Sequence, residues 1–319
     1  MPPETRFAIM AACIYLPLAL GYLSRKAGLL DADASRRISR TTILTLEPAT
    51  VFVGCWVLDI TSVGRAALVP VIGALVSLGL LGVGLAGSRL LRHRPERRGA
   101  YLVSAMMSNI GMSLGGFVCY MFLGVQGQGL SVLYTAHFLP VCFTLGCILA
   151  SHYASPGKAT VGQTLRSVFR NPLVFIPNSA LVVGLAVNAA GLAVPTWIGP
   201  VNAAVVFAVV SLHAYAIGLT LRVSRLARYW REAVGLAVTK FALGPLLAVG
   251  VVIVLGQWGA FDGLMWRVAV IEGAMPVAIF ATVVSNLFGL DRDLANSAWV
   301  TTTLACAAII PALYLITHP

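Results

Sequence analysis

Residues 66–88 read AALVPVIGALVSLGLLGVGLAGS, a stretch without a single charged side chain. A helix of about 20 apolar residues is long enough to cross the hydrocarbon core of a bilayer. The rest of the chain has the same character, because 59% of its 319 residues are hydrophobic and only 10% are charged. A soluble domain carries about 25% charged residues. The composition therefore predicts an all-α integral membrane protein.

Ten transmembrane helices are predicted between the charged or glycine-rich breaks of the sequence. They cover residues 7–23, 38–58, 66–88, 100–123, 130–151, 172–190, 198–221, 232–255, 264–287 and 294–316. The first of them resembles the apolar core of a signal peptide, but no small-residue cleavage site follows it. We therefore count it as a span, and no stretch is left over for a soluble domain.

The basic residues indicate the orientation of the spans. Of the 22 Lys and Arg residues, 18 lie in or directly beside alternate loops, those after the first, third, fifth, seventh and ninth spans. Such residues are retained on the cytoplasmic side. We therefore expect a multi-pass protein of the inner (plasma) membrane with both termini on the outer side. The net charge of +11 does not indicate a nucleic-acid partner, because the basic residues sit in short loops between apolar runs. The expected partner is the lipid bilayer.

Prolines and one glycine recur at corresponding places in the two halves of the chain. The pairs are Pro17 and Pro177, Pro70 and Pro245, Pro140 and Pro311, and Gly116 and Pro276. They predict a first five-helix repeat over residues 1–155, a cytoplasmic linker over 156–171, and a second repeat over 172–319. An odd number of spans inverts the second copy across the membrane, as the loop charges also require.

Inverted repeats are typical of alternating-access transporters, whose substrate sites lie near the bilayer midplane on broken helices. A break frees backbone N–H and C=O groups, which a membrane tolerates only beside a ligand, water or protein. Two segments fit this description. They are residues 108–116, which contain SNIG and GG, in the fourth span and residues 272–276, EGAMP, in the ninth. We expect the binding site at these two breaks.

Four stretches resemble the auxin efflux carrier family, and the likeness extends over nearly the whole chain. They are GYLSRKAGLLD at 21–31, PATVF at 48–52, AMPVA at 274–278 and FGLD at 288–291. The resemblance implies ten helices in two inverted halves, with broken helices 4 and 9 crossing. It also implies a scaffold of helices 1, 2, 6 and 7 and a transport unit of helices 3–5 and 8–10. Members carry auxin-like weak acids or small carboxylates, often as homodimers.

The resemblance assigns some residues and leaves others unmatched. The family's helix-4 asparagine falls on Asn109, and its helix-9 proline falls on Pro276. Gly116 stands where the family usually has a proline, so this break is expected to depend on glycine flexibility. Glu47 replaces a usually apolar residue, and Glu272 is also unusual.

Glu272 is similar to the sodium-binding glutamate of the bile-acid:sodium symporter family, which also uses a helix-4 Ser-Asn pair. A glutamine of that pattern is replaced here by Pro276, which puts a second sodium site in doubt. The hydroxyls of Ser131 and Thr135 lie four residues apart on one helix face and could complete a set of oxygen ligands of the kind that hard cations prefer. The Na⁺ hypothesis thus uses Ser108, Asn109, Ser131, Thr135 and Glu272.

A charged side chain within a predicted span indicates a functional role, because an ionised group inside a membrane is costly unless it is paired or binds an ion. Glu272 is expected to couple transport to an ion, with pairing to Lys240 as the alternative. Glu47 is either a proton carrier or a cap for the backbone at Pro48, and both readings stay open. His213 is expected to pack rather than relay protons. The full predicted substrate- and ion-binding set is Ser108, Asn109, Gly111, Glu272, Met275, Pro276, Ser131, Thr135, Glu47 and Lys240.

These features favour a secondary active transporter of a small organic anion or auxin-like weak acid, coupled to Na⁺ or H⁺. The alternative is a membrane ligand sensor that uses the same fold without transport. An enzyme is not expected, since the sequence has no HExxH or GxSxG motif and no span with two neighbouring carboxylates. The six cysteines form no CxxC pair, so no cofactor or metal cluster is expected beyond the coupling ion.

Overall fold

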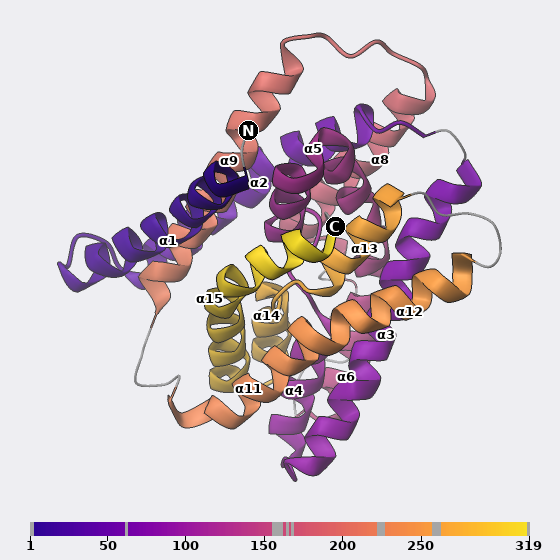
Figure 1. Ribbon diagram of the computed structural model, residues 1–319. Coiled ribbons are helices and arrows are strands. Elements are labelled where there is room, and N and C mark those ends of the chain that lie inside the picture. The colour runs from indigo at the N-terminus through magenta and orange to yellow at the C-terminus, as the bar shows by residue number, and fades with distance from the viewer. Residues whose placement is uncertain are drawn as a thin grey trace. The chain divides into compact units, whose positions relative to one another are not determined.

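The computed structural model describes residues 3–60, 63–154, 162–163, 166, 169–221, 227–256 and 263–317. Every regular element within these ranges is helical (Figure 1). Within the described ranges, six helices are long and apolar enough to cross a membrane, or seven if the bent pair Arg292–Cys306 and Ala308–Thr317 forms one span. The chain is thus an all-helical protein of the membrane class. The count of ten spans and the inverted repeat stay predictions, and the predicted linker 156–171 lies largely outside the described residues.

The helices group into two compact units, each built from separate parts of the sequence. Unit 1 comprises Met1–Asp59, Gly111–Val132 and Asn171–Arg222, and unit 2 comprises Ile60–Ile110, Leu133–Arg170 and Val223–Pro319. Both units draw on both halves of the chain, so this division differs from the predicted boundary between the repeats.

Four long helices form most of unit 1: α1 (Pro3–Lys26), α2 (Ala32–Trp56), α8 (Pro172–Ala189) and α9 (Ile198–Thr220). Helix α9 packs against α1 and α2, and α2 also packs against α8. The backbones of α1 and α9 touch, because a Cβ atom at Gly218 would collide with the carbonyl oxygen of Leu18. Small residues permit such close helix contacts inside membranes. Arg25 closes the contact by donating to the carbonyl of Leu219, at 2.9 Å, at the end of α9.

Helix α5 (Leu114–Tyr134) contains a sharp reversal at Gly124. This glycine has φ 72° and ψ −163°, a conformation that glycine adopts without steric penalty. A Cβ atom at Gly127 would lie 2.9 Å from the carbonyl oxygen of Cys119, although eight residues of continuous helix span about 12 Å. The chain therefore folds back at Gly124, between the predicted fourth and fifth spans.

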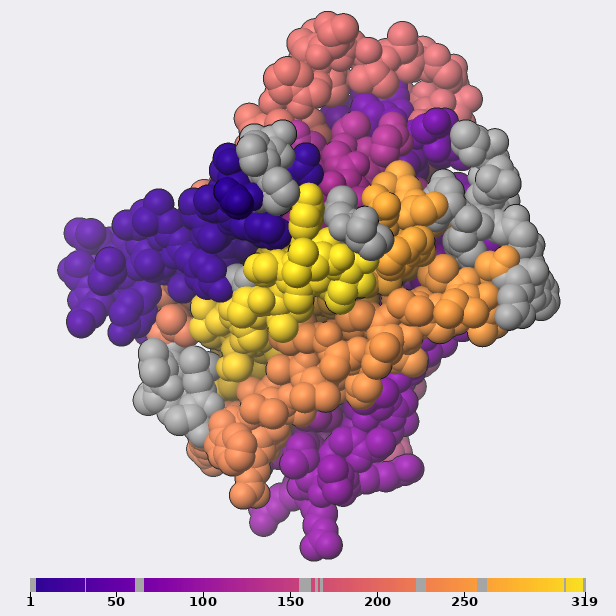
Figure 2. Space-filling view, in the orientation of Figure 1, coloured from indigo at the N-terminus to yellow at the C-terminus, as the bar shows by residue number. Residues whose placement is uncertain are grey.

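Unit 2 contains most of the remaining helices and their interruptions. The α-helices are α3 (Val63–Leu90), α4 (Pro95–Met106), α6 (Thr144–His152), α11 (Trp230–Val238), α12 (Gly244–Gly256), α13 (Gly263–Gly273), α14 (Ile279–Leu287) and α15 (Arg292–Thr317). Short 3₁₀ turns are η1 (Thr135–His137) and η3 (Ala227–Tyr229), and π-helical segments are η2 (Phe138–Phe143) and η4 (Thr239–Leu243). Helix α12 packs on α3 and α13, and Figure 2 shows the yellow surface of α15 adjoining the orange surface of α11.

The π-helical segment η4 has a local cause in the sequence. Pro245 follows it closely and has no N–H group with which to close the usual bond to the carbonyl four residues earlier. Directly before this proline, the N–H of Gly244 bonds to the carbonyl of Thr239, five residues earlier. The wider turn re-orients the side chains of the segment, including Lys240. Such segments are frequent at functional sites.

A cluster of charged side chains ties three elements of unit 2 together. Arg97 of α4 donates to Glu232 of α11 at 3.3 Å and to Asp291, just before α15, at 3.4 Å. The hydroxyl of Tyr229 donates to the same Asp291 carboxylate at 3.1 Å. His93 lies 3.6 Å from the Glu232 carboxylate. The FGLD stretch thus ends in a residue that anchors α15 to α4.

Candidate functional site

Two helices of unit 2 end abruptly, and the chain that follows each of them is extended. Helix α4 ends at Met106, and helix α13 ends at Gly273. In the extended segments, Ser108 and Val277 form an isolated antiparallel bridge. Both residues are buried. The glycine-rich break and the proline-marked break therefore meet in the interior of this unit.

Backbone hydrogen bonds on both sides of the bridge hold the two segments together. The N–H of Asn109 donates to the carbonyl of Pro276 at 2.8 Å, and the N–H of Ala278 donates to the carbonyl of Met107 at 3.0 Å. Groups freed by one break thus satisfy groups freed by the other, as a buried backbone in a membrane requires. We call residues 107–109 and 276–278 the crossing.

A side chain from α15 completes the hydrogen bonding of the crossing. The N–H of Val277 donates to the hydroxyl oxygen of Thr302 at 3.1 Å, and that hydroxyl donates to the carbonyl of Ala298 at 2.7 Å. Thr302 is fully buried. It is absent from the predicted site set, although a run of three threonines at 301–303 inside an apolar span was a signal that could have indicated it.

Lys240 is also fully buried and binds the crossing directly. Its ammonium group donates to the carbonyl of Ala105 at 2.6 Å, to the hydroxyl of Ser108 at 2.8 Å and to the carbonyl of Met107 at 3.3 Å. An ammonium group has three donors, and all three are used here. The bonds lie at the carboxyl end of α4, where the partial negative charge of the helix dipole favours a cation.

A close backbone contact fixes Lys240 next to the crossing. A Cβ atom at Gly244 would collide with the carbonyl oxygen of Gly273, and a Cβ atom at Gly273 would lie 2.8 Å from the carbonyl oxygen of Gly244. The start of α12 therefore touches the end of α13 without intervening side chains. Glu272, which is 1% exposed, immediately precedes this contact.

The structure assigns the predicted site residues to both units. Unit 2 holds Ser108, Asn109, Thr135, Lys240, Glu272, Met275 and Pro276. Unit 1 holds Glu47, Gly111 and Ser131. Hydrogen bonds join Ser108 to Lys240 and Asn109 to Pro276, while Met275 and Glu272 lie buried in the chain that leads into the crossing. In the described part of the chain, no three His, Cys, Asp or Glu side chains gather as a metal site would require.

Glycines shape the break of the fourth span in two different ways. Gly111 has φ +40°, in the region that favours glycine. Gly116 is needed for space, because a Cβ atom there would collide with the carbonyl oxygen of Gly111. The flexibility expected of Gly116 thus belongs to Gly111, and Gly116 permits a close approach of the backbone.

Unit 1 contains a second buried contact between ionisable groups. Glu47 of α2 lies with its Oε1 atom 3.6 Å from Nε2 of His213 in α9. Glu47 is 7% exposed, and the Nδ1 atom of His213 is buried without a hydrogen-bond partner among the described residues. Packing was predicted for His213 in preference to a proton relay, and its contact with the Glu47 carboxylate makes it a candidate for proton binding.

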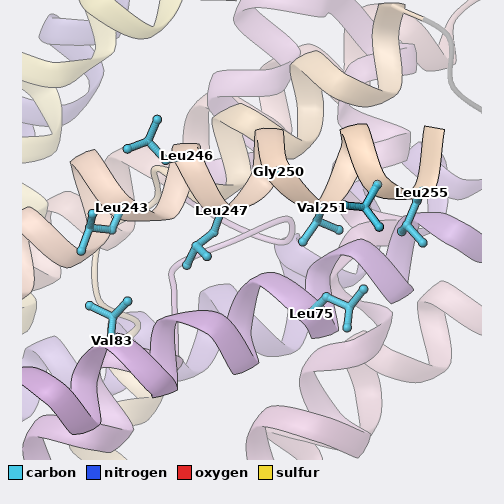
Figure 3. Close-up of a pocket in the computed structure, with 9 residues that line it drawn as sticks. Leu75, Val83, Leu243, Leu246, Leu247, Gly250, Val251 and Leu255 are labelled. Atoms are coloured by element: carbon cyan, nitrogen blue, oxygen red, sulfur yellow. The ribbon is translucent and has the colours of Figure 1, made fainter. Parts of the chain in front are cut away.

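A groove of about 430 Å³ lies between α3 and α12 in unit 2 (Figure 3). Its lining consists of Leu75, Val83, Leu243, Leu246, Leu247, Gly250, Val251, Val254 and Leu255. These aliphatic side chains offer no hydrogen bond to a carboxylate, and they suit the acyl chains of a lipid. The groove is therefore not the candidate site for an anion.

Comparison with known proteins supports a transporter role. No family model matches the chain. An uncharacterized transporter of Methanothermobacter thermautotrophicus is 26% identical over 293 residues, which are 92% of this chain and 92% of that protein. An uncharacterized transporter of Methanocaldococcus jannaschii is 22% identical over 305 residues, with 93% of this chain and 94% of that protein covered. The likeness to proteins named as transporters thus extends over nearly the full length of each chain.

Proposed function

We propose that this transporter-like chain is a secondary active transporter that moves a small organic anion or auxin-like weak acid by alternating access. The observation that carries the proposal is the crossing, where two broken helices pair through the Ser108–Val277 bridge. Interrupted helices inside a membrane protein are typical of substrate sites in secondary transporters. Membership of the auxin efflux carrier family, with a homodimer as the assembly, fits this proposal.

The charges around the crossing favour an anion over a cation as the substrate. The buried ammonium group of Lys240 lies there, and α14 begins directly after the crossing at Ile279. The N-cap residue of α14, Ala278, has no side chain that could satisfy the first N–H groups of the helix. The amino end of a helix carries partial positive charge and is suited to bind carboxylates. Asn109 adds an amide that can donate to a carboxylate.

Proton coupling is the form of energy coupling that the buried contacts favour. Glu47 and His213 are both able to bind a proton, and their side chains lie 3.6 Å apart in unit 1. The rival is sodium coupling through Ser108, Asn109, Ser131, Thr135 and Glu272. In the proposed cycle, unit 2 carries the crossing to alternate sides of the membrane.

Flux across sealed proteoliposomes tests the proposal and separates it from a ligand sensor. A panel of labelled carboxylates and weak acids is offered to vesicles preloaded with the same unlabelled compound. We expect saturable uptake that is stimulated by the internal compound and is missing from protein-free vesicles. A compound that raises the melting temperature of the purified protein but never crosses the membrane would identify a sensor instead.

A further inference from the structure

The carboxyl end of α4 is bound by a cation that belongs to the chain. The three oxygen atoms around the Lys240 ammonium group come from Ala105, Met107 and Ser108, at 2.6, 3.3 and 2.8 Å. Lys240 has no exposed surface. A charge in this position is stabilised by the carbonyl dipoles of the helix end and by the hydroxyl. The lysine is therefore an integral part of the crossing.

One of these three oxygen atoms, the hydroxyl of Ser108, is also a ligand in the predicted sodium site. Sodium prefers hard oxygen ligands, and Ser108 is the hydroxyl that the sodium hypothesis places at this break. Its Oγ atom already accepts a hydrogen bond from Lys240. The carbonyl of Met107 accepts from both Lys240 and the N–H of Ala278. A sodium ion beside Ser108 would find the Ser108 hydroxyl and the Met107 carbonyl already hydrogen-bonded, and the nearby ammonium group of Lys240 would repel it.

The position of Lys240 is fixed by a backbone contact of its helical segment as well as by the hydrogen bonds of its side chain. It lies in the π-helical segment η4, four residues before Gly244. The contact between Gly244 and Gly273 joins that segment to the end of α13. The ammonium group therefore stays with the crossing as long as α12 and α13 remain packed.

We propose that Lys240 is a tethered cation that takes the place of a coupling sodium ion at the crossing. Its ammonium group neutralises the end of α4 and occupies the Ser108 hydroxyl, so the site binds no Na⁺ and anion transport is independent of sodium. This inference deepens the proposed function and rests on it where flux is concerned. Cation binding is measured on the purified chain without transport, so failure of one proposal is distinguishable from failure of the other.

The unmodified protein provides the first test. Its thermal unfolding is compared in sodium, potassium and choline chloride at the same concentration, together with carboxylate uptake in the same salts. We expect the same melting temperature and the same uptake in all three. A saturable rise in melting temperature that is specific to Na⁺ would overturn the proposal. Absence of flux in every salt would count against the transporter function and leave the melting comparison valid.

Removal of the ammonium group provides the second test. Lys240→Ala leaves the three oxygen atoms without their donor, so we expect a lower melting temperature that methylammonium or Na⁺ partly restores. Tetramethylammonium has no N–H group and should restore nothing. Lys26→Ala, at the exposed end of α1, is the matched control and should show neither loss nor rescue. A Lys240→Ala protein as stable as the parent, with no response to either cation, would refute the idea.

A milder variant covers the case in which Lys240→Ala does not fold. Ser108→Ala removes one of the three acceptors and leaves the ammonium group in place. We expect a lower melting temperature that is equal in sodium and potassium chloride. An unchanged melting temperature, or stabilisation by Na⁺ alone, would contradict a cation role for Lys240.

Discussion

At the residue scale, Glu47 and His213 are the side chains best placed to exchange a proton within unit 1. Their polar atoms lie 3.6 Å apart. We predict that Glu47→Gln abolishes substrate accumulation driven by a pH gradient, because an amide cannot release a proton. Exchange of internal for external substrate should persist, since it requires no net proton movement. Accumulation and exchange are both measured in proteoliposomes, and the expected loss of accumulation is at least about tenfold, the equivalent of 1.4 kcal/mol.

Glu4→Gln is the matched control for this prediction, because Glu4 is exposed in the first turn of α1. It should accumulate substrate as the parent does. A Glu47→Gln protein that still concentrates substrate against a pH gradient would exclude this residue from coupling.

His93 lies outside the predicted spans, and it should make the stability of the protein depend on pH. Burial lowers the pKa of His93 below its usual 6.5, and the nearby Glu232 carboxylate only partly opposes this effect. The unfolded chain then binds the proton more readily than the folded chain does, so stability is complete above about pH 6.5 and falls as the pH decreases further. Melting temperatures between about pH 5 and 8 should show this loss, and His93→Gln should reduce it.

The control for His93 is the exposed His152 at the end of α6. His152→Gln should leave the decrease in melting temperature at low pH unchanged. Equal acid sensitivity of the parent and the His93→Gln protein would show that other groups cause the loss.

At the element scale, the contact between α12 and α13 should be intolerant of a single methyl group. Gly244→Ala places a Cβ atom against the carbonyl oxygen of Gly273, and overpacking of this kind costs about 1–3 kcal/mol. Gly250 lies in the same helix with open space around its Cα atom. Gly250→Ala should therefore change stability by less than about 1 kcal/mol. Thermal unfolding of both variants checks the prediction, and equal melting temperatures would contradict the packing described here.

The helices and their interruptions are the part of the fold that could be predicted from the sequence. Apolar runs predicted the helices, and glycine and proline predicted the places where helices are interrupted near 108–116 and 272–276. The reversal at Gly124 lies where two predicted spans are separated by only a few residues. These features are local, because hydrophobicity, φ preference and a missing N–H group act within one turn of chain.

The partners of the interrupted segments were not predictable in the same way. Lys240 binds two backbone carbonyls, and any residue type carries a carbonyl, so the sequence holds no sign of this pairing. The same is true of Gly244 and Gly273, whose contact depends on how two helices pack. Only the tertiary structure brings these distant groups together.

At the scale of the whole molecule, two units are assembled from interleaved segments, and the crossing lies entirely in one of them. Near full-length likeness to two proteins named as transporters agrees with this organisation serving transport. The central claim is that the crossing in unit 2 binds the transported anion. Asn109 is the residue of the crossing whose side chain is best suited to bind a carboxylate.

The most direct measurement compares substrate exchange by Asn109→Ala with exchange by Asn178→Ala in proteoliposomes, after equal folding is verified by thermal unfolding. Asn178 is a matched control because its amide bonds to the carbonyl of Val174 within α8. A lost hydrogen bond to a charged group costs about 1.5–3 kcal/mol, so the rate at subsaturating substrate should fall at least about tenfold for Asn109→Ala and stay near the parent's for Asn178→Ala. Undiminished exchange by a folded Asn109→Ala protein would contradict the crossing as the substrate site.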